Sequence, residues 1–238
     1  IGMVVDSDEL ERASLVSEIV ELTASDFDVR VPEDKVLFAD RSPAQVDAHL
    51  ARLLADGQVD LIVTLGVIAC HRAVQYPNLT KPVIAADFVD PVLQRLPIDG
   101  SGGSGRKNLT YVSQPSTVDR DLREMYSLVP FRRVAMVVYA PLWGTPLAPP
   151  PIPAAAELGF TIDVIPVDGH PRGALGVLSS DVDAVYLTAL PALPDEAVSQ
   201  FAEKLVARGL PSFSIRTASR SGSPTRRRPS AACRTTPA

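Results

Sequence analysis

The chain has 238 residues, of which 46% are hydrophobic and 5% aromatic, and a net charge of −5. This is enough apolar material for one large domain or two small ones, with a core built mostly from Val, Leu, Ala and Ile. The negative charge argues against a nucleic-acid-binding protein. The sequence contains no apolar run of about 18 residues, so we expect no transmembrane helix. Two cysteines, Cys70 and Cys233, provide neither a disulfide framework nor a metal cluster.

The first half of the chain alternates between strand-like and helix-like segments. The chain begins inside an apolar run at Ile1, with no initiator Met and no signal peptide, which we interpret as a mature or trimmed end. Short apolar or alternating runs predict strands, and apolar residues at helical spacing predict helices. The predicted strands are 1–6, 27–32, 59–66, 82–88 and 107–113, and the predicted helices are 8–24, 42–57 and 67–76. Such alternation predicts a parallel sheet covered on both faces.

The stretch GSGGSG at 100–105 matches the glycine pattern that cradles a dinucleotide pyrophosphate. That motif works only where it ends a strand and opens a helix. Here a proline-containing segment precedes the glycines, and the strand-like run 107–113 follows them. We therefore predict an exposed, flexible surface loop and no nucleotide or other cofactor site.

A second series of strands and helices follows. The predicted strands are 132–140, 161–167, 183–190 and 211–215, and the predicted helices are 116–130, capped by Ser116 or Thr117, and 195–209. In the first of these helices, Asp119, Arg120, Asp121 and Arg123 are expected to form a solvated face. The segment 141–154 holds six prolines where the alternation requires a helix, so only its end and the AAAEL run after it are expected to be helical.

The last 23 residues differ from the rest of the chain. Residues 216–238 contain six Arg and no acidic residue, so the remaining residues carry a net charge of −11. They contain no Val, Ile, Leu, Met, Phe, Trp or Tyr. A segment of this composition buries no core, and we predict a disordered basic tail.

Several sequence blocks, in order along the chain, resemble one protein family. They include IGMVVDSDEL, VDLIVTLGVIACH, KPVIAADFVDP, KNLTYVS and DVDAVYLTALPAL. Together they are similar to the substrate-binding component of ABC-type uptake systems with the type I periplasmic-binding-protein fold. The resemblance covers about 1–140 and 155–215 and rests on many weak blocks rather than on one catalytic signature.

The resemblance implies two Rossmann-like α/β lobes with parallel sheets that close on a small, amino acid-like solute. It also implies a periplasmic or extracytoplasmic location and a membrane permease subunit as partner, with no enzymatic activity, no metal and no nucleic acid. We expect the lobes to occupy 1–113 and 114–215, followed by the tail 216–238.

Ligands of open α/β sheets lie beyond the carboxyl ends of the strands, so the strand-end turns are the candidate binding residues. Gly66 opens a helix whose N–H groups suit a carboxylate, Asp87 suits an ammonium group, and Phe88 suits packing against a side chain. The full candidate set is Asp6, Ser7, Thr64, Leu65, Gly66, Asp87, Phe88, Tyr139 and Thr188.

Structural roles remain open for several of these residues. Asp6 and Asp87 also suit capping of the segments that follow them, Thr64 suits a hydroxyl bonded to backbone, and Phe88 suits the core. The adjacent pair Cys70 and His71 predicts no joint site, because neighbouring helix positions point in different directions. No Ser–His–Asp set, paired carboxylates or metal-ligand spacing stands out.

The chain departs from the resemblance at its end. Members of the family continue beyond the strand that matches PSFSI and return to the first lobe, whereas here the basic tail follows. Our hypothesis is that residues from about 216 onward are a frameshift product or come from a partial gene, and that 141–154 is a second, compensated slip. Two other functions stay open: an interaction protein whose basic tail binds anions, and a Rossmann-like enzyme of unknown reaction.

Overall fold

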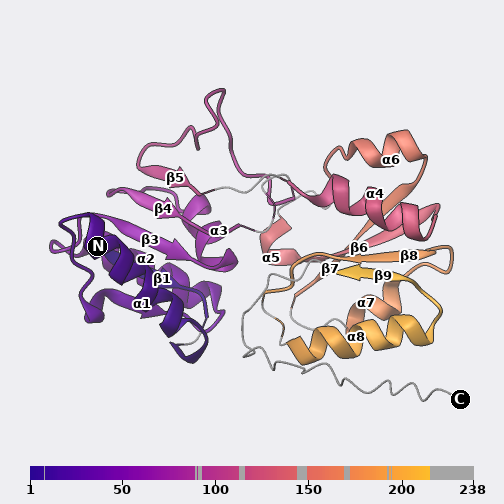
Figure 1. The fold of residues 1–238 in the computed structure, drawn as a ribbon, viewed down its shortest axis with the longest axis horizontal. Helices are drawn as coiled ribbons and strands as arrows, with labels where there is room; N and C mark the ends of the chain where they lie inside the picture. Colours follow the sequence, from indigo (N-terminus) through magenta and orange to yellow (C-terminus); the bar gives the residue numbers. More distant parts are fainter. Residues whose placement is uncertain are drawn as a thin grey trace, which may run out of the picture.

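The computed structural model describes residues 1–7, 9–88, 90, 93–112, 116–143, 149–168, 172–191, 193 and 195–214. The expectations for the tail 216–238 and for part of the proline-rich stretch lie outside the described residues. Figure 1 shows two α/β lobes, the first in indigo to magenta and the second in pink to yellow.

The first lobe contains a five-stranded sheet in the order β2-β1-β3-β4-β5, and all of its described strand pairs are parallel. The strands are β1 (Gly2–Val5), β2 (Val36–Phe38), β3 (Ile62–Leu65), β4 (Val83–Ala85) and β5 (Leu109–Tyr111). The helices are α1 (Glu9–Asp26), α2 (Pro43–Ala55) and α3 (Val67–Gln75), with a 3-10 turn, η1 (Glu33–Lys35), before β2. The Ser42 hydroxyl caps α2 by accepting a hydrogen bond from Gln45 N.

The predicted strand 27–32 is wrong. Helix α1 continues to Asp26, and the strand that pairs with β1 is β2, with Val36 opposite Met3 and Phe38 opposite Val5. In the predicted segment, the Phe27 side chain is 65% exposed. Alternation alone therefore indicated a strand in a segment whose Val31 is only partly buried against the core, whereas the short run VLF pairs with β1 and buries Leu37.

The second lobe contains a four-stranded parallel sheet in the order β7-β6-β8-β9. The strands are β6 (Arg133–Tyr139), β7 (Thr161–Val167), β8 (Ala184–Leu187) and β9 (Ser212–Ser214), and the helices are α4 (Val118–Leu128), α5 (Ala140–Trp143), α6 (Pro153–Leu158), α7 (Arg172–Val177) and α8 (Asp195–Ala207). Helix α6 confirms that the end of the proline-rich stretch is helical. The expected α/β class with two Rossmann-like lobes is confirmed, and the boundaries after residues 113 and 215 stay predictions.

Apolar side chains cover both faces of the second sheet, as buried parallel sheets require. One face packs into a core cluster that includes Val137, Val185 and Leu205 and continues into the first lobe through α2 and α3. The other face packs Met136 and Tyr186 against α4 and α6.

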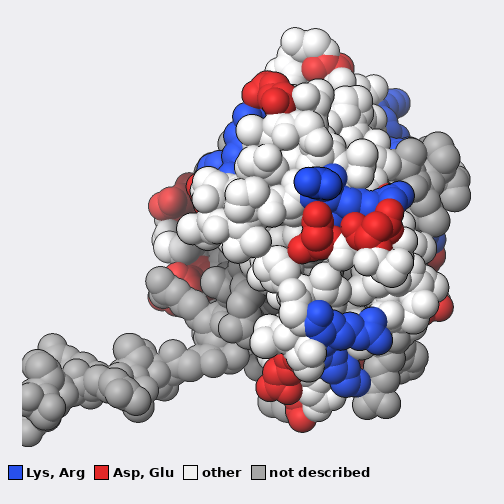
Figure 2. All heavy atoms as spheres, turned by 90° about the vertical axis from the view of Figure 1, so that its right-hand side faces the viewer, with Lys and Arg blue, Asp and Glu red and all other residues white. Residues whose placement is uncertain are grey.

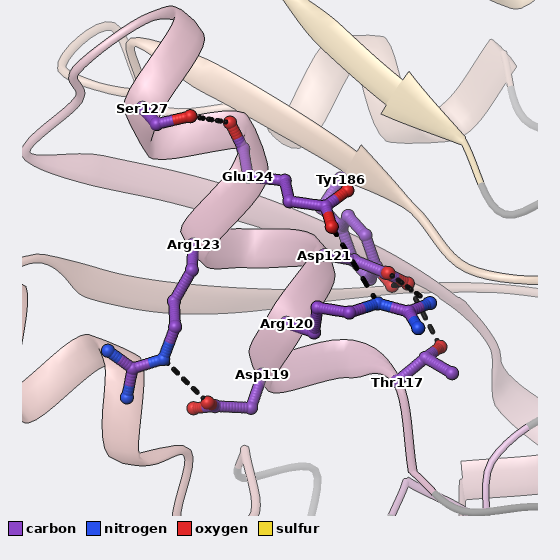
Figure 3. A network of polar contacts seen from close by, with 8 residues as sticks. All are labelled: Thr117, Asp119, Arg120, Asp121, Arg123, Glu124, Ser127 and Tyr186. Atoms are coloured by element: carbon purple, nitrogen blue, oxygen red, sulfur yellow. Dashed lines mark hydrogen bonds and ion pairs between the residues drawn. The ribbon is translucent and has the colours of Figure 1, made fainter.

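The expected solvated face of α4 is wrong for Asp121, which is only 6% exposed. Figure 3 shows its carboxylate among Thr117, Arg120 and Tyr186, and the Tyr186 hydroxyl donates to Asp121 Oδ2 at 3.2 Å. Burial, reinforced by this carboxylate, raises the pKa of Tyr186. The charge is tolerated because several donors converge on it.

Asp119 and Arg123 of the same helix join α4 to α6 rather than facing only solvent. The Asp119 carboxylate accepts hydrogen bonds from Arg123 Nε at 2.8 Å and from Ala154 N at 2.6 Å. Arg123 also lies 2.8 Å from the Glu157 carboxylate. These contacts hold α6 against α4.

Charged side chains of both signs lie side by side on the outer end of the second lobe (Figure 2). In the second lobe, Arg133 pairs with Asp163 at 2.8 Å and with Asp181. Exposed pairs of this kind contribute little to stability.

The glycine loop at 100–105 precedes β5 and opens no helix, as predicted. Its turn is organised by Asp99, whose carboxylate accepts hydrogen bonds from Ser101 N at 2.9 Å and Gly103 N at 3.0 Å. The backbone donors that a phosphate would need are thus bound to a carboxylate of the chain itself.

Candidate ligand-binding site

The carboxyl ends of the two sheets face each other across a contact between α3 and α5. Helix α3 follows β3 directly, and α5 follows β6 directly. Figure 1 places both helices between the two sheets. The buried ring of His71 on α3 interacts with the backbone of Pro141 on α5. Helices α3 and α5 therefore touch where the carboxyl ends of β3 and β6 lie, and open α/β sheets bind ligands at the carboxyl ends of their strands. Of the candidate residues, only Tyr139 and Thr188 line the cavity described below.

The amino end of α3 is occupied by a carboxylate of the chain. Asp6 Oδ2 accepts hydrogen bonds from Ile68 N at 2.6 Å and Ala69 N at 3.4 Å. Gly66, at φ +92°, opens the helix, and a Cβ there would overlap the Asp6 carboxylate. The expectation that this end of α3 offers free N–H groups to a ligand is therefore wrong for Ile68 and Ala69. Asp6 takes the capping role that the sequence had left open.

Ser7 follows Asp6 and is 4% exposed. Its hydroxyl oxygen has no hydrogen-bond partner among the described residues. Leu65 is also buried, at the carboxyl end of β3. Buried hydroxyls without a protein partner are uncommon, so Ser7 keeps its place among the candidate binding residues.

Thr64 and Asp87 meet at the Cys70 thiol. The Thr64 hydroxyl lies 3.3 Å from Cys70 Sγ, and Asp87 N donates to the same sulfur at 3.2 Å. Burial raises the pKa of the Cys70 thiol to about 12, so it is an unreactive packing group. Thr64 is fully buried in this contact, whereas the Asp87 side chain is half-buried.

Phe88 packs in the core of the first lobe. It is 4% exposed and makes an edge-to-face contact with Tyr111, with ring centroids 5.4 Å apart. The Tyr111 hydroxyl is buried and has no partner among the described residues, and burial raises its pKa. Phe88 therefore has the structural role that the sequence left open, and Tyr111 brings a buried polar group to the end of β5.

Tyr139 and Thr188 are brought together at a cavity of about 20 Å³, which is room for about one water molecule. Tyr139 ends β6, and Thr188, which follows β8, donates its hydroxyl to Val137 O at 2.9 Å. Burial, together with the charge of Asp168, raises the pKa of Tyr139. The cavity is lined by Leu93, Gln94, Val138, Tyr139, Leu142, Trp143, Thr188 and Ala189.

Trp143 is the most informative cavity residue that the sequence did not single out. It lies at the end of α5, is 3% exposed, and its indole Nε1 has no partner among the described residues. Its position just after the predicted strand 132–140, as the chain's only Trp, was the available signal.

Asp90 joins the cavity to α4. It is fully buried and accepts hydrogen bonds from Leu93 N at 2.9 Å, Ser116 Oγ at 2.7 Å and Thr117 N at 3.1 Å. Leu93 lines the cavity, whereas Ser116 and Thr117 lead into the second lobe. The connection between β4 and β5 is thereby fixed to the start of α4.

Within the described residues, no group of three or more His, Cys, Asp or Glu side chains is arranged to hold a metal ion. In the same part of the chain, no helix combines the length and apolar character needed to cross a membrane.

No protein-family model and no curated protein matches the sequence. Among solved structures, an ABC domain in complex with L-Trp from Streptococcus pneumoniae is 18% identical, with a TM-score of 0.62 over 91% of this chain and 73% of that one. A type 1 periplasmic binding protein from Bordetella pertussis is 13% identical, with a TM-score of 0.59 over 90% of this chain and 61% of that one.

A third solved structure is a fatty acid ABC transporter substrate-binding protein from Thermomonospora curvata. It is 14% identical, with a TM-score of 0.58 over 90% of this chain and 57% of that one. These three proteins bear names of binding proteins or of an ABC domain, not of enzymes. The chain has the fold of type I periplasmic binding proteins, as its sequence blocks predicted, and it spans only part of the length of these proteins.

Proposed function

We propose that the chain is the solute-binding component of an ABC-type uptake system. It acts outside the cytoplasmic membrane, binds a small solute between its two lobes and presents it to a membrane permease subunit. The observation that carries this proposal is the convergence of Tyr139, Trp143 and Thr188, from the carboxyl ends of β6 and β8, on one cavity. The fold shared with substrate-binding proteins of ABC systems supports it.

We favour binding over catalysis because the polar side chains Asp6 and Cys70 are engaged in the fold or unreactive. The carboxylate of Asp6 is engaged in capping α3, and the Cys70 thiol has a pKa of about 12. A catalytic acid, base or nucleophile needs a pKa near the working pH and access to a substrate. The rival proposal of a basic anion-binding tail concerns 216–238, which lies outside the described residues.

A thermal-shift screen of the purified chain tests the proposal. The panel contains amino acids, aromatic carboxylates, neutral aromatic compounds, fatty acids and nucleotides, and each hit is confirmed by titration calorimetry. At least one small solute raises the melting temperature, because binding to the folded state alone stabilises it.

Variants locate the binding site. Trp143→Ala removes a buried ring of the cavity and lowers the affinity for the hit about tenfold or more. Phe27→Ala, which removes a ring that is 65% exposed, leaves the affinity unchanged. If no solute in the panel stabilises the chain, or if both variants behave alike, the proposal is wrong. If an amino acid is the hit, Asp87→Ala tests whether Asp87 receives its ammonium group.

A further inference from the structure

The cavity at the carboxyl ends of β6 and β8 has an uncharged lining. Six of its eight described lining residues are apolar or aromatic, namely Leu93, Val138, Tyr139, Leu142, Trp143 and Ala189. The other two are Gln94 and Thr188, which are neutral. A charged ligand group transferred into such surroundings without a partner loses far more hydration energy than an uncharged one. The lining therefore favours a solute whose buried part carries no formal charge.

The carboxylates of Asp6, Asp90 and Asp168 are either bound to other groups of the chain or exposed to water. Asp6 caps α3, and Asp90 accepts hydrogen bonds from Leu93 N, Ser116 Oγ and Thr117 N. Asp168 influences Tyr139, but its side chain is exposed, so water screens its charge. The cavity thus has no buried carboxylate among its described lining residues to receive an ammonium group.

One buried donor at the cavity requires an acceptor. Indole Nε1 only donates hydrogen bonds, and Trp143 Nε1 is buried without a partner among the described residues. Leaving such a buried donor without an acceptor destabilises the folded chain. A carbonyl, hydroxyl or ether oxygen of a ligand would accept this hydrogen bond. A ligand carboxylate would also accept it, but one N–H donor does not offset the hydration energy that a buried carboxylate loses.

We propose that the cavity takes an uncharged solute with an apolar, ring-like or branched body and an acceptor oxygen that pairs with Trp143 Nε1. This inference rests on the proposed solute-binding function and narrows its ligand. It replaces the amino acid-like solute that the sequence blocks implied with a neutral one. The cavity must enlarge to hold such a solute, because its volume of about 20 Å³ has room for only about one water molecule.

Three probes that share one ring test the charge. Phenylacetamide is neutral, phenylacetate is an anion and L-phenylalanine is a zwitterion. Titration calorimetry on the intact chain is expected to give phenylacetamide at least a tenfold lower Kd than either charged probe. Tighter binding of phenylacetate or L-phenylalanine overturns the charge argument and leaves the solute-binding function standing.

A fourth probe, ethylbenzene, lacks the acceptor and isolates the hydrogen bond. In the unaltered chain, phenylacetamide is expected to bind about fivefold more tightly than ethylbenzene, which is the worth of one typical hydrogen bond. In Trp143→Phe, which keeps an aromatic ring but loses the N–H, this ratio falls to about one. The ratio separates the hydrogen bond from the loss of ring area, which affects both probes.

An unchanged ratio in Trp143→Phe overturns the role of the indole donor. If none of the four probes binds, while the thermal-shift panel yields a ligand that carries a formal charge, the inference is wrong and the proposed function survives. If neither the probes nor any panel member binds, the proposed function fails as well.

Discussion

The fully buried carboxylate of Asp90 accepts a 2.7 Å hydrogen bond from the hydroxyl of Ser116. Asp90 lies in the connection between β4 and β5 of the first lobe, and Ser116 lies just before α4 of the second lobe. The same carboxylate also binds the backbone N–H groups of Leu93 and Thr117. A buried carboxylate held by donors from both segments fixes their positions, because the loss of any donor leaves part of the charge unsatisfied.

Replacing Asp90 is therefore expected to be costly. Asp90→Ala leaves Leu93 N, Ser116 Oγ and Thr117 N without this acceptor. We expect it to lower the free energy of unfolding by about 4 kcal/mol or more, since hydrogen bonds to charged groups contribute about 1.5–3 kcal/mol each. Asp99→Ala is the matched control, because that carboxylate also binds two backbone N–H groups, but in an exposed turn. Urea unfolding of both variants checks the prediction, and equal losses would contradict it.

Because Gly66 lies in the tight turn between β3 and α3, we expect an alanine there to destabilise the fold far more than an alanine at Gly57. Gly66→Ala places a Cβ against the Asp6 carboxylate at a φ of +92°, so the cap of α3 and the strand-end turn must both shift. We expect a loss of about 3 kcal/mol or more, because strain and the lost cap add. Gly57→Ala has open space around its Cβ and is expected to change stability by less than about 1 kcal/mol. Thermal unfolding of the two variants distinguishes these outcomes.

The buried His71 predicts a pH dependence of stability. Burial, and next the charge of Arg72, lower the pKa of this histidine from 6.5 to about 4. The folded chain therefore binds fewer protons than the unfolded chain between these values. The contribution of neutral His71 to the free energy of unfolding is fully present above pH 6.5 and is lost as the pH falls toward 4. The loss reaches about 3 kcal/mol, at 1.36 kcal/mol per pKa unit.

His71→Gln isolates this effect from the titration of carboxylates. The variant is expected to show a flatter decline of unfolding free energy between pH 6.5 and 4 than the unaltered chain. His49→Gln, which loses the contact between His49 Nε2 and Phe38 O at 2.9 Å, serves as the control. Parallel pH profiles of His71→Gln and the unaltered chain would show that folding does not lower the pKa of His71.

The sequence predicted the architecture better than the site because periodicity reports burial directly. The run RRVAMVVYA predicted a buried strand, and β6 is buried along nearly its whole length. The misplaced strand at 27–32 shows the limit of this rule, since a short alternating run carries no information about its pairing partner. Asp6 and Phe88 illustrate the same limit for the site. Their residue types suited both a ligand and a structural role, and only the distances to Ile68 N and to the Tyr111 ring separate the two.

Trp143 and Asp90 were not predictable for a different reason. Their environments depend on contacts between segments far apart in the chain, such as Asp90 with Ser116 and Trp143 with the residues after β4 and β8. Asp121 is a related case, because a charge on an amphipathic helix normally faces water, and its burial depends on Tyr186 from β8. Local spacing gives no signal of such long-range hydrogen bonds.

The central claim, that a solute binds between the lobes and draws them together, is tested most directly by the distance between the lobes. Fluorescent labels at Gln58→Cys and Glu203→Cys lie on exposed positions of the first and second lobe, with Cys233 replaced by Ser and the buried Cys70 left in place. Energy transfer is measured with and without a saturating solute from the thermal-shift screen. We predict that the solute increases transfer in the unaltered cavity and that Trp143→Ala abolishes the increase at the same concentration, because closure depends on ligand contacts made by both lobes. A solute that binds with unchanged transfer, or an increase that survives Trp143→Ala, would contradict the account.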